Sequence, residues 1–134
     1  MNGKEVRWKQ RFINFEKTFK LLERTIAIKN LSEAEKGGVI QFYEVCFELA
    51  WKTMKDYLEN EGYEVKSPRG VIKQAFQMGL IEEGELWIAA LEDRNLTSHI
   101  YDEMLINQIV EKIQGTNFVL LKKLYQFFKN VHEQ

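Results

Sequence analysis

Residues 94–102, RNLTSHIYD, hold side chains suited to chemistry on a phosphate ester. Arg94 offers a planar, permanently charged guanidinium that can grip a phosphate through two hydrogen bonds and stabilise charge building at phosphorus. His99 can donate and accept protons near neutral pH, and Asn95 could orient the imidazole or a phosphate oxygen. RNA needs no metal ion for cleavage by such a set, because its own 2′-hydroxyl can attack. Candidate catalytic residues are therefore Arg94, Asn95 and His99, with Ser98 and Asp102 as candidate supporting residues.

The spacing of these residues limits how they can meet. A helix of about 100° per residue places them on two lines: Arg94, Ser98 and Tyr101 on one, and Asn95, His99 and Asp102 on the other. Arg94 and His99 then face different directions on one straight helix. A single chain could bring Arg94 and His99 together only by breaking the helix. Two chains packed about a two-fold axis could instead bring the arginine and histidine lines of both copies into one cleft.

Each of these residues also has a purely structural interpretation. Arg94 is the one basic residue among six acidic ones in residues 81–102, so it could simply form a surface ion pair with a glutamate or aspartate. His99 alone could be a partly buried structural histidine. Tyr101 alone could be an aromatic at the core edge with its hydroxyl at the rim.

The bulk composition indicates a single folded domain spanning residues 1–134. The chain is 45% hydrophobic and 29% charged, and it holds one proline. One cysteine, Cys46, allows no internal disulfide, and the first residues lack the apolar core of a signal peptide. No apolar run approaches the ~18 residues of a membrane span. We expect a cytoplasmic protein without membrane contact.

Charge and motif content narrow the function further. The net charge of −1 argues against the protein as a whole being an electrostatic nucleic-acid binder. Residues 1–30 hold eight basic and three acidic residues, either a solvated surface or a contact for phosphate or an acidic partner. His99 and His132 are far apart, and no H-E-x-x-H, P-loop or G-x-G-x-x-G pattern occurs. We expect no metal and no cofactor.

Apolar periodicity predicts helices throughout. The first stripe has spacings of three and four: Trp8, Phe12, Phe15, Phe19, Leu22 and Ile26. A second stripe runs from Val39 to Leu58 and includes Cys46 as a small core residue. Ser32 with Glu35 predicts a capping box at its start, and Gly37-Gly38 marks a candidate break.

Turn and cap signals divide the rest of the chain. Gly62 ends the second helix, and Ser67-Pro68 begins a third. The buried face of this third helix is expected to comprise Val71, Ile72, Ala75, Phe76 and Leu80. Asp102-Glu103 begins the last long helix, which Gly115-Thr116-Asn117 is expected to kink. No window alternates as a strand should. The prediction is an all-α, up-down bundle of four to five helices, three long and two shorter.

Three segments in this order resemble a known family. They are Phe47–Leu58 (FELAWKTMKDYL) followed by Gly62, the helix start Ser67-Pro68-Arg69, and Arg94-Asn95-x-x-x-His99-x-Tyr101-Asp102. Together they resemble the nucleotidyltransferase substrate-binding protein family, a branch of the HEPN superfamily. The resemblance covers roughly residues 7–130.

The resemblance implies a HEPN-like helical bundle that forms a homodimer and pairs with a separately encoded minimal nucleotidyltransferase. In many HEPN relatives the R-x-x-x-x-H motif is a metal-independent ribonuclease site built across the dimer, which here implies Arg94, Asn95 and His99. Such pairs act as toxin and antitoxin. The transferase silences the toxin by adenylylating a tyrosine, which corresponds here to Tyr101.

Two other functions remain open. The acidic site and the modest net charge would suit a non-catalytic, nucleotide- or substrate-binding subunit of a two-component nucleotidyltransferase. A structural helical dimer without any site is the third interpretation. The RNA or small-molecule target is not specified by any of these patterns.

Overall fold

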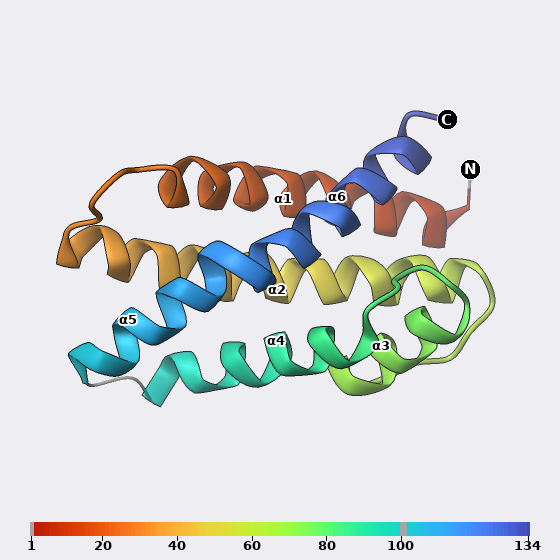
Figure 1. Ribbon diagram of the computed structural model, residues 1–134. Coiled ribbons are helices and arrows are strands. Elements are labelled where there is room, and N and C mark those ends of the chain that lie inside the picture. The colour runs from red at the N-terminus through yellow and green to blue at the C-terminus, as the bar shows by residue number, and fades with distance from the viewer. Residues whose placement is uncertain (1, 100–101) are drawn as a thin grey trace.

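The computed structural model describes residues 2–99 and 102–134, and its described residues form only helices and their connections (Figure 1). The helices are α1 (Gly3–Ile26), α2 (Glu33–Asn60), α3 (Pro68–Gln77), α4 (Gly84–Leu96), α5 (Glu103–Lys112) and α6 (Phe118–His132). A 3₁₀ turn, Thr97–His99, extends α4, and a π-helical turn, Ile113–Asn117, joins α5 to α6. The predicted all-α up-down bundle is confirmed.

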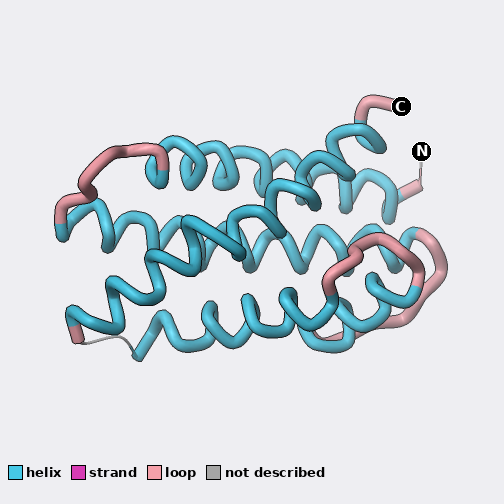
Figure 2. The backbone as a smooth tube through the Cα atoms, viewed as in Figure 1, coloured by secondary structure: helices cyan, strands magenta, loops and turns pink. Residues whose placement is uncertain are grey.

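The long helices run up and down and are joined by connections at the two ends of the bundle (Figure 2). α1 packs along α2, while α5 and α6 form one kinked helix that crosses over the bundle (Figure 1). The short helix α3 lies at the end near both chain termini. The end of α4 and the start of α5 lie at the opposite end.

Aromatic side chains dominate the core between α1, α2 and α6. The first predicted stripe is buried from Trp8 to Leu22, and α2 buries its own stripe, including Cys46. Phe19 of α1 stacks on Tyr125 of α6, with ring centroids 4.6 Å apart. Two predicted details were wrong: α2 continues through Gly37-Gly38 without a break, and Phe76 of α3 is 51% exposed.

Local side chains set the helix boundaries. The capping box at Ser32 and Glu35 is present, with hydrogen bonds of 2.8 and 3.1 Å, and it fixes the start of α2. Gly62 takes a positive φ of 95°, which is accessible to glycine, where α2 ends. At the other end of the bundle, Asp102 accepts a hydrogen bond of 2.7 Å from the Met104 N–H and starts α5.

The predicted kink near Gly115 is present as the π-helical turn. Such a turn inserts an extra residue into a helix and redirects its side chains. Here it turns Asn117 into the core, where its side chain is 2% exposed. Among the described residues, no helix combines the length and apolar character needed to cross a bilayer.

Candidate functional site

The candidate catalytic residues lie where α4 ends and α5 begins, at one end of the bundle (Figure 1). Arg94 is in the last turn of α4, and His99 is the last residue of the 3₁₀ turn that follows. Arg94 is half-buried, whereas Asn95, Ser98, His99 and Asp102 are exposed. Tyr101, the predicted site of adenylylation, lies outside the described residues.

The Arg94 guanidinium contacts α2. Its Nη2 lies 3.1 Å from Glu48 Oε2, and both side chains are partly exposed, at 29% and 31%. Glu48 also accepts a hydrogen bond of 3.1 Å from Trp51 Nε1. Within one chain, Arg94 therefore does form an ion pair, as its structural interpretation required. Its Nε is buried and has no hydrogen-bond partner among the described residues.

A second acid on α2 holds the 3₁₀ turn. The Thr97 hydroxyl oxygen lies 2.9 Å from Glu44 Oε2 and 2.7 Å from the carbonyl oxygen of Arg94. Glu44 and Glu48 are one helical turn apart, so they face the end of α4 together. Sequence reasoning missed both acids because each lies about fifty residues before its partner and the motif gives no sign of them.

His99 faces a different element. It lines a hollow of about 200 Å³ between the end of α4 and α5. The other lining residues are Asp93, Leu96, Leu105, Gln108, Ile109 and Lys112. The described geometry of one chain therefore sets Arg94 against α2 and His99 beside α5. Arg94 does not line the hollow that His99 lines.

A buried polar network anchors the C-terminal end of α4 to the core. The Asp93 carboxylate, in a residue that is 4% exposed, accepts hydrogen bonds of 2.7 Å from Lys112 Nζ and 2.9 Å from Asn117 Nδ2. Asn117 also donates to the Tyr43 hydroxyl oxygen at 3.3 Å, and that hydroxyl donates to the Ala90 carbonyl at 2.6 Å.

The Tyr43 hydroxyl keeps the proton that these hydrogen bonds require. Burial, reinforced by the nearby Asp93 charge, raises the pKa of Tyr43 well above its ordinary value, so the phenol remains a donor at neutral pH. Each Asp93 oxygen has a donor, which offsets the cost of burying the carboxylate. The residue before Arg94 is thus held firmly by α5 and the π-helical turn.

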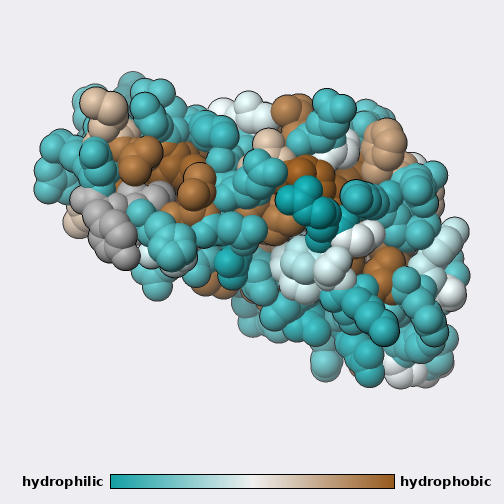
Figure 3. All heavy atoms as spheres, turned by 90° about the horizontal axis from the view of Figure 1, so that it is seen from below, coloured by the Kyte–Doolittle hydropathy of each residue, from teal (hydrophilic) through white to brown (hydrophobic). Residues whose placement is uncertain are grey.

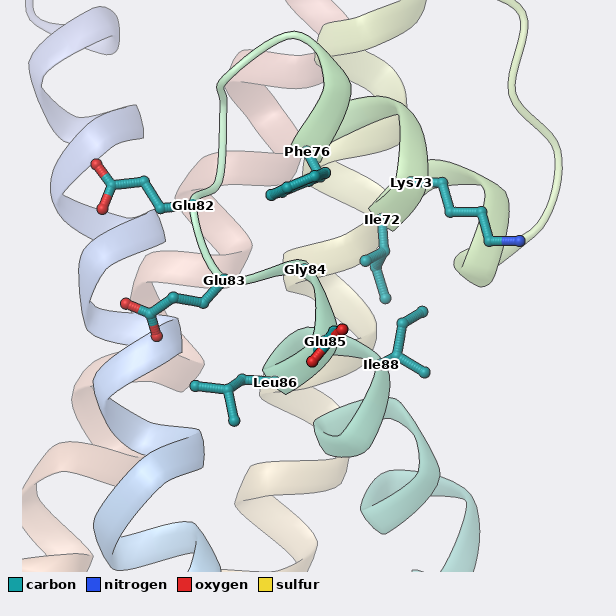
Figure 4. A pocket seen from close by; sticks show the side chains of 9 residues that line it. All are labelled: Ile72, Lys73, Phe76, Glu82, Glu83, Gly84, Glu85, Leu86 and Ile88. Carbon is teal, nitrogen blue, oxygen red and sulfur yellow. The ribbon is translucent and has the colours of Figure 1, made fainter.

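Other features of the chain offer no comparable chemistry. Among the described residues, no group of three or more histidine, cysteine, aspartate or glutamate side chains is arranged to hold a metal ion. Burial raises the pKa of Cys46 to about 12, so its thiol is a poor nucleophile. A hollow of about 510 Å³ lies between α3 and the start of α4, where Ile72, Phe76 and Ile88 form apolar walls (Figure 4). It does not include any motif residue.

Apolar side chains are exposed around the motif. Leu96, Met104 and Leu105 are 55%, 67% and 48% exposed, and they flank the exposed His99 in sequence. Figure 3 shows apolar surface at one end of the molecule, with further apolar patches along the same face. Exposed apolar groups of this size often mark a contact with another protein chain.

Comparison with known proteins places this chain in a family. A family model described as nucleotidyltransferase substrate binding protein like matches residues 10–130. A curated relative from Haemophilus influenzae, called probable ribonuclease HepT, is 32% identical over 72 residues. That match covers 50% of this chain and 49% of the relative, so the chain spans about half the length of this relative in the match.

Two solved structures share the fold. A crystal structure of a Thermus thermophilus protein superposes with a TM-score of 0.78 at 31% identity, covering 90% of this chain and 99% of the other. A Haemophilus influenzae structure, titled as revealing the fold of a substrate binding domain of a nucleotidyltransferase, has a TM-score of 0.77 at 23% identity. It covers 88% of this chain and 98% of the other, and at this identity the likeness concerns the fold.

Proposed function

The chain belongs to the nucleotidyltransferase substrate binding protein like family, and from this premise we propose that it is a toxin-type, metal-independent ribonuclease controlled by a partner nucleotidyltransferase. Its active site forms between two copies of the chain, with Arg94 from one copy and His99 from the other. The name of the Haemophilus influenzae relative, probable ribonuclease HepT, agrees with this activity.

One observation carries the proposal. Arg94, Asn95 and His99 all lie at one end of α4, but in a single chain Arg94 contacts α2 and His99 lines a hollow against α5. Leu96, Met104 and Leu105 are exposed, and Leu96 and Leu105 line the hollow together with His99. These side chains offer a surface that a second copy would cover. A two-fold contact there would place the Arg94 of one copy opposite the His99 of the other.

The chemistry assigns a role to each group. His99 takes the proton from the 2′-hydroxyl, whose oxygen attacks the neighbouring phosphorus, and a proton is returned to the departing 5′-oxygen. The products are a 2′,3′-cyclic phosphate and a free 5′-hydroxyl. Arg94 stabilises the charge that develops on the phosphoryl oxygens, and Asn95 orients the imidazole or one of those oxygens.

RNA cleavage in the presence of EDTA tests the activity. The purified protein should cut single-stranded RNA, and His99→Ala and Arg94→Ala should each slow cleavage by about a hundredfold or more. Matched controls are His132→Gln and Arg69→Ala, since Arg69 forms only a long, exposed ion pair of 3.7 Å with Glu92. Equal cleavage by the His99 and His132 variants would refute the proposal.

Control by the transferase would act on Tyr101. Adenylylation joins the phenol oxygen to the α-phosphorus of ATP and releases pyrophosphate, placing a bulky anion two residues from His99. Mass spectrometry of protein co-expressed with its nucleotidyltransferase should find the added AMP on the Tyr101 peptide. Tyr101→Phe should remain active under the same conditions. An unmodified Tyr101 peptide in a silenced complex would contradict this step.

A non-catalytic substrate-binding subunit is the second candidate. The observation that favours it is the acidic environment of Arg94, since Glu44 and Glu48 both face the end of α4. Acidic side chains repel an RNA backbone. In this case the protein would bind a nucleotide and the transferase but leave RNA intact, and isothermal titration calorimetry with both ligands distinguishes the two candidates.

A further inference from the structure

We propose that the hollow between the end of α4 and α5 is a phosphate-binding subsite in which Lys112 and Gln108 act together with His99. The phosphate would be a phosphodiester of RNA or the phosphate of a free nucleotide. The proposal rests on the proposed function for its place in the reaction, but phosphate binding itself does not depend on RNA cleavage.

The residues around the hollow fit an anion of this size. His99, Gln108 and Lys112 come from two elements and face one space of about 200 Å³. Each can donate a hydrogen bond, and Lys112 carries a full positive charge. Leu96, Leu105 and Ile109 form the apolar part of the wall, which reduces competition from water.

The Lys112 ammonium is positioned by one ion pair and has further N–H groups that can donate to an anion. Its Nζ lies 2.7 Å from Asp93 Oδ1, so one of the three ammonium N–H groups is used. The two charged side chains differ in exposure, at 53% for Lys112 and 6% for Asp93. Both groups line the hollow, and the Lys112 ammonium is the more exposed of the two and offsets the Asp93 charge there. Asn117 donates to the other Asp93 oxygen at 2.9 Å and so holds this support in place.

Lys112 also provides a cation beside His99 from the same chain. The Arg94 guanidinium contacts Glu48 on α2 and does not line the hollow. Residues 81–102 hold no other basic residue, so the motif brings no second cation to His99. The fold brings one from α5. Lys112 and His99 of one copy would then bind the phosphate that Arg94 of the other copy also contacts.

Proton NMR with inorganic phosphate tests the subsite directly. At constant ionic strength and pH, phosphate should shift the His99 ring signal in the wild type and leave His132 unchanged. Lys112→Met should abolish the shift. The matched control is Lys122→Met, because Lys122 is exposed on α6 and has no ion pair among the described residues. A His99 shift that survives Lys112→Met, or that chloride alone produces, would overturn the proposal.

The source of the phosphate is resolved with two further ligands in the same titration. AMP represents a free nucleotide, and a 2′-O-methyl oligoribonucleotide represents an RNA strand that cannot be cut. Either ligand should shift the His99 signal only when Lys112 is present, and the tighter one identifies the source. If neither ligand shifts the His99 signal of the wild type, the subsite does not exist.

Mixing variant copies separates this inference from the proposed function. Lys112→Met mixed with Arg94→Ala should recover cleavage, because one site then keeps Lys112, His99 and an Arg94. Lys112→Met mixed with His99→Ala should not recover, since both groups belong to the same half of a site. Recovery in the second mixture would overturn the assignment of Lys112. Absence of cleavage by the wild type would instead refute the ribonuclease while the phosphate titration still tests the subsite.

Discussion

Glu48 holds the Arg94 guanidinium through a contact that is only partly buried. Partly exposed ion pairs contribute about 0–1 kcal/mol to stability. We therefore expect Glu48→Ala to lower the free energy of unfolding by no more than about 1 kcal/mol. The same change should slow RNA cleavage by about tenfold or more, because the guanidinium loses the partner that aims it.

Glu59→Ala is the matched control for that change. Glu59 pairs with Lys55 at 3.0 Å, and both side chains are about as exposed as those of Arg94 and Glu48. Glu59→Ala should lower the free energy of unfolding by a similar amount and leave the rate of RNA cleavage unchanged. If Glu48→Ala cleaves RNA as fast as Glu59→Ala, Glu48 does not position Arg94 for the reaction.

Cys46 gives a second prediction at the residue scale. Burial raises its pKa from 9.0 to about 12, so the folded protein should react with a thiol reagent at pH 8 roughly a thousandfold more slowly than a free cysteine. The raised pKa favours the folded state fully below pH 9, and this contribution is lost as the pH rises from about 9 to about 12. Reagent kinetics with and without denaturant measure the first effect, and urea unfolding of wild type and Cys46→Ala at pH 7 and 10 measures the second. Rapid modification of the folded protein would contradict the prediction.

The helices themselves were largely predictable because their causes are local. The stripe from Trp8 to Leu22, the capping box at Ser32 and the kink near Gly115 all arise from residues a few positions apart. Gly37-Gly38 was misread as a candidate break because packing of the long α2 outweighs the low helix propensity of two glycines. Phe76 was misplaced because periodicity identifies an apolar face without saying whether another element covers it.

The surroundings of the candidate site were not predictable in the same way. Asp93 of α4 meets Lys112 and Asn117, which lie where α5 joins the π-helical turn, and only the tertiary packing of this turn against α4 brings the three together. The motif residues could be chosen from side-chain chemistry and family resemblance. Their partners could not, because an ion pair between residues nineteen positions apart leaves no local pattern.

The π-helical turn carries a prediction at the element scale. Asn117→Ala removes the donor at 2.9 Å from Asp93 and the contact at 3.3 Å with Tyr43, both in the core. An unsatisfied buried acceptor costs about 1–3 kcal/mol, so we expect a loss of that size in urea unfolding. Asn14→Ala, at an exposed position on α1, should change little. A loss below about 0.5 kcal/mol for Asn117→Ala would show that the network does not anchor the turn.

At the scale of the whole molecule, the exposed apolar end should mediate the homodimer. Met104 is 67% exposed, so Met104→Glu should change monomer stability by less than about 0.5 kcal/mol. It should nevertheless shift the protein from dimer to monomer in sedimentation velocity, because a charge would be buried in the interface. Val119→Glu is the control, since Val119 is 47% exposed on α6. Equal dimerisation by both variants would place the interface elsewhere.

The composite site makes the sharpest prediction for the assembly. Arg94→Ala and His99→Ala are each expected to be inactive alone, since every site between identical copies lacks one group. In a mixed dimer, one of the two sites receives Arg94 from the His99→Ala copy and His99 from the Arg94→Ala copy. Denaturing and refolding the two variants together should therefore restore up to about a quarter of wild-type cleavage, because half of the dimers are mixed and each has one of two sites intact. Joint refolding with Met104→Glu in both chains should abolish this recovery, and cleavage that stays at the level of the separate variants would show that Arg94 and His99 act within one chain or not at all.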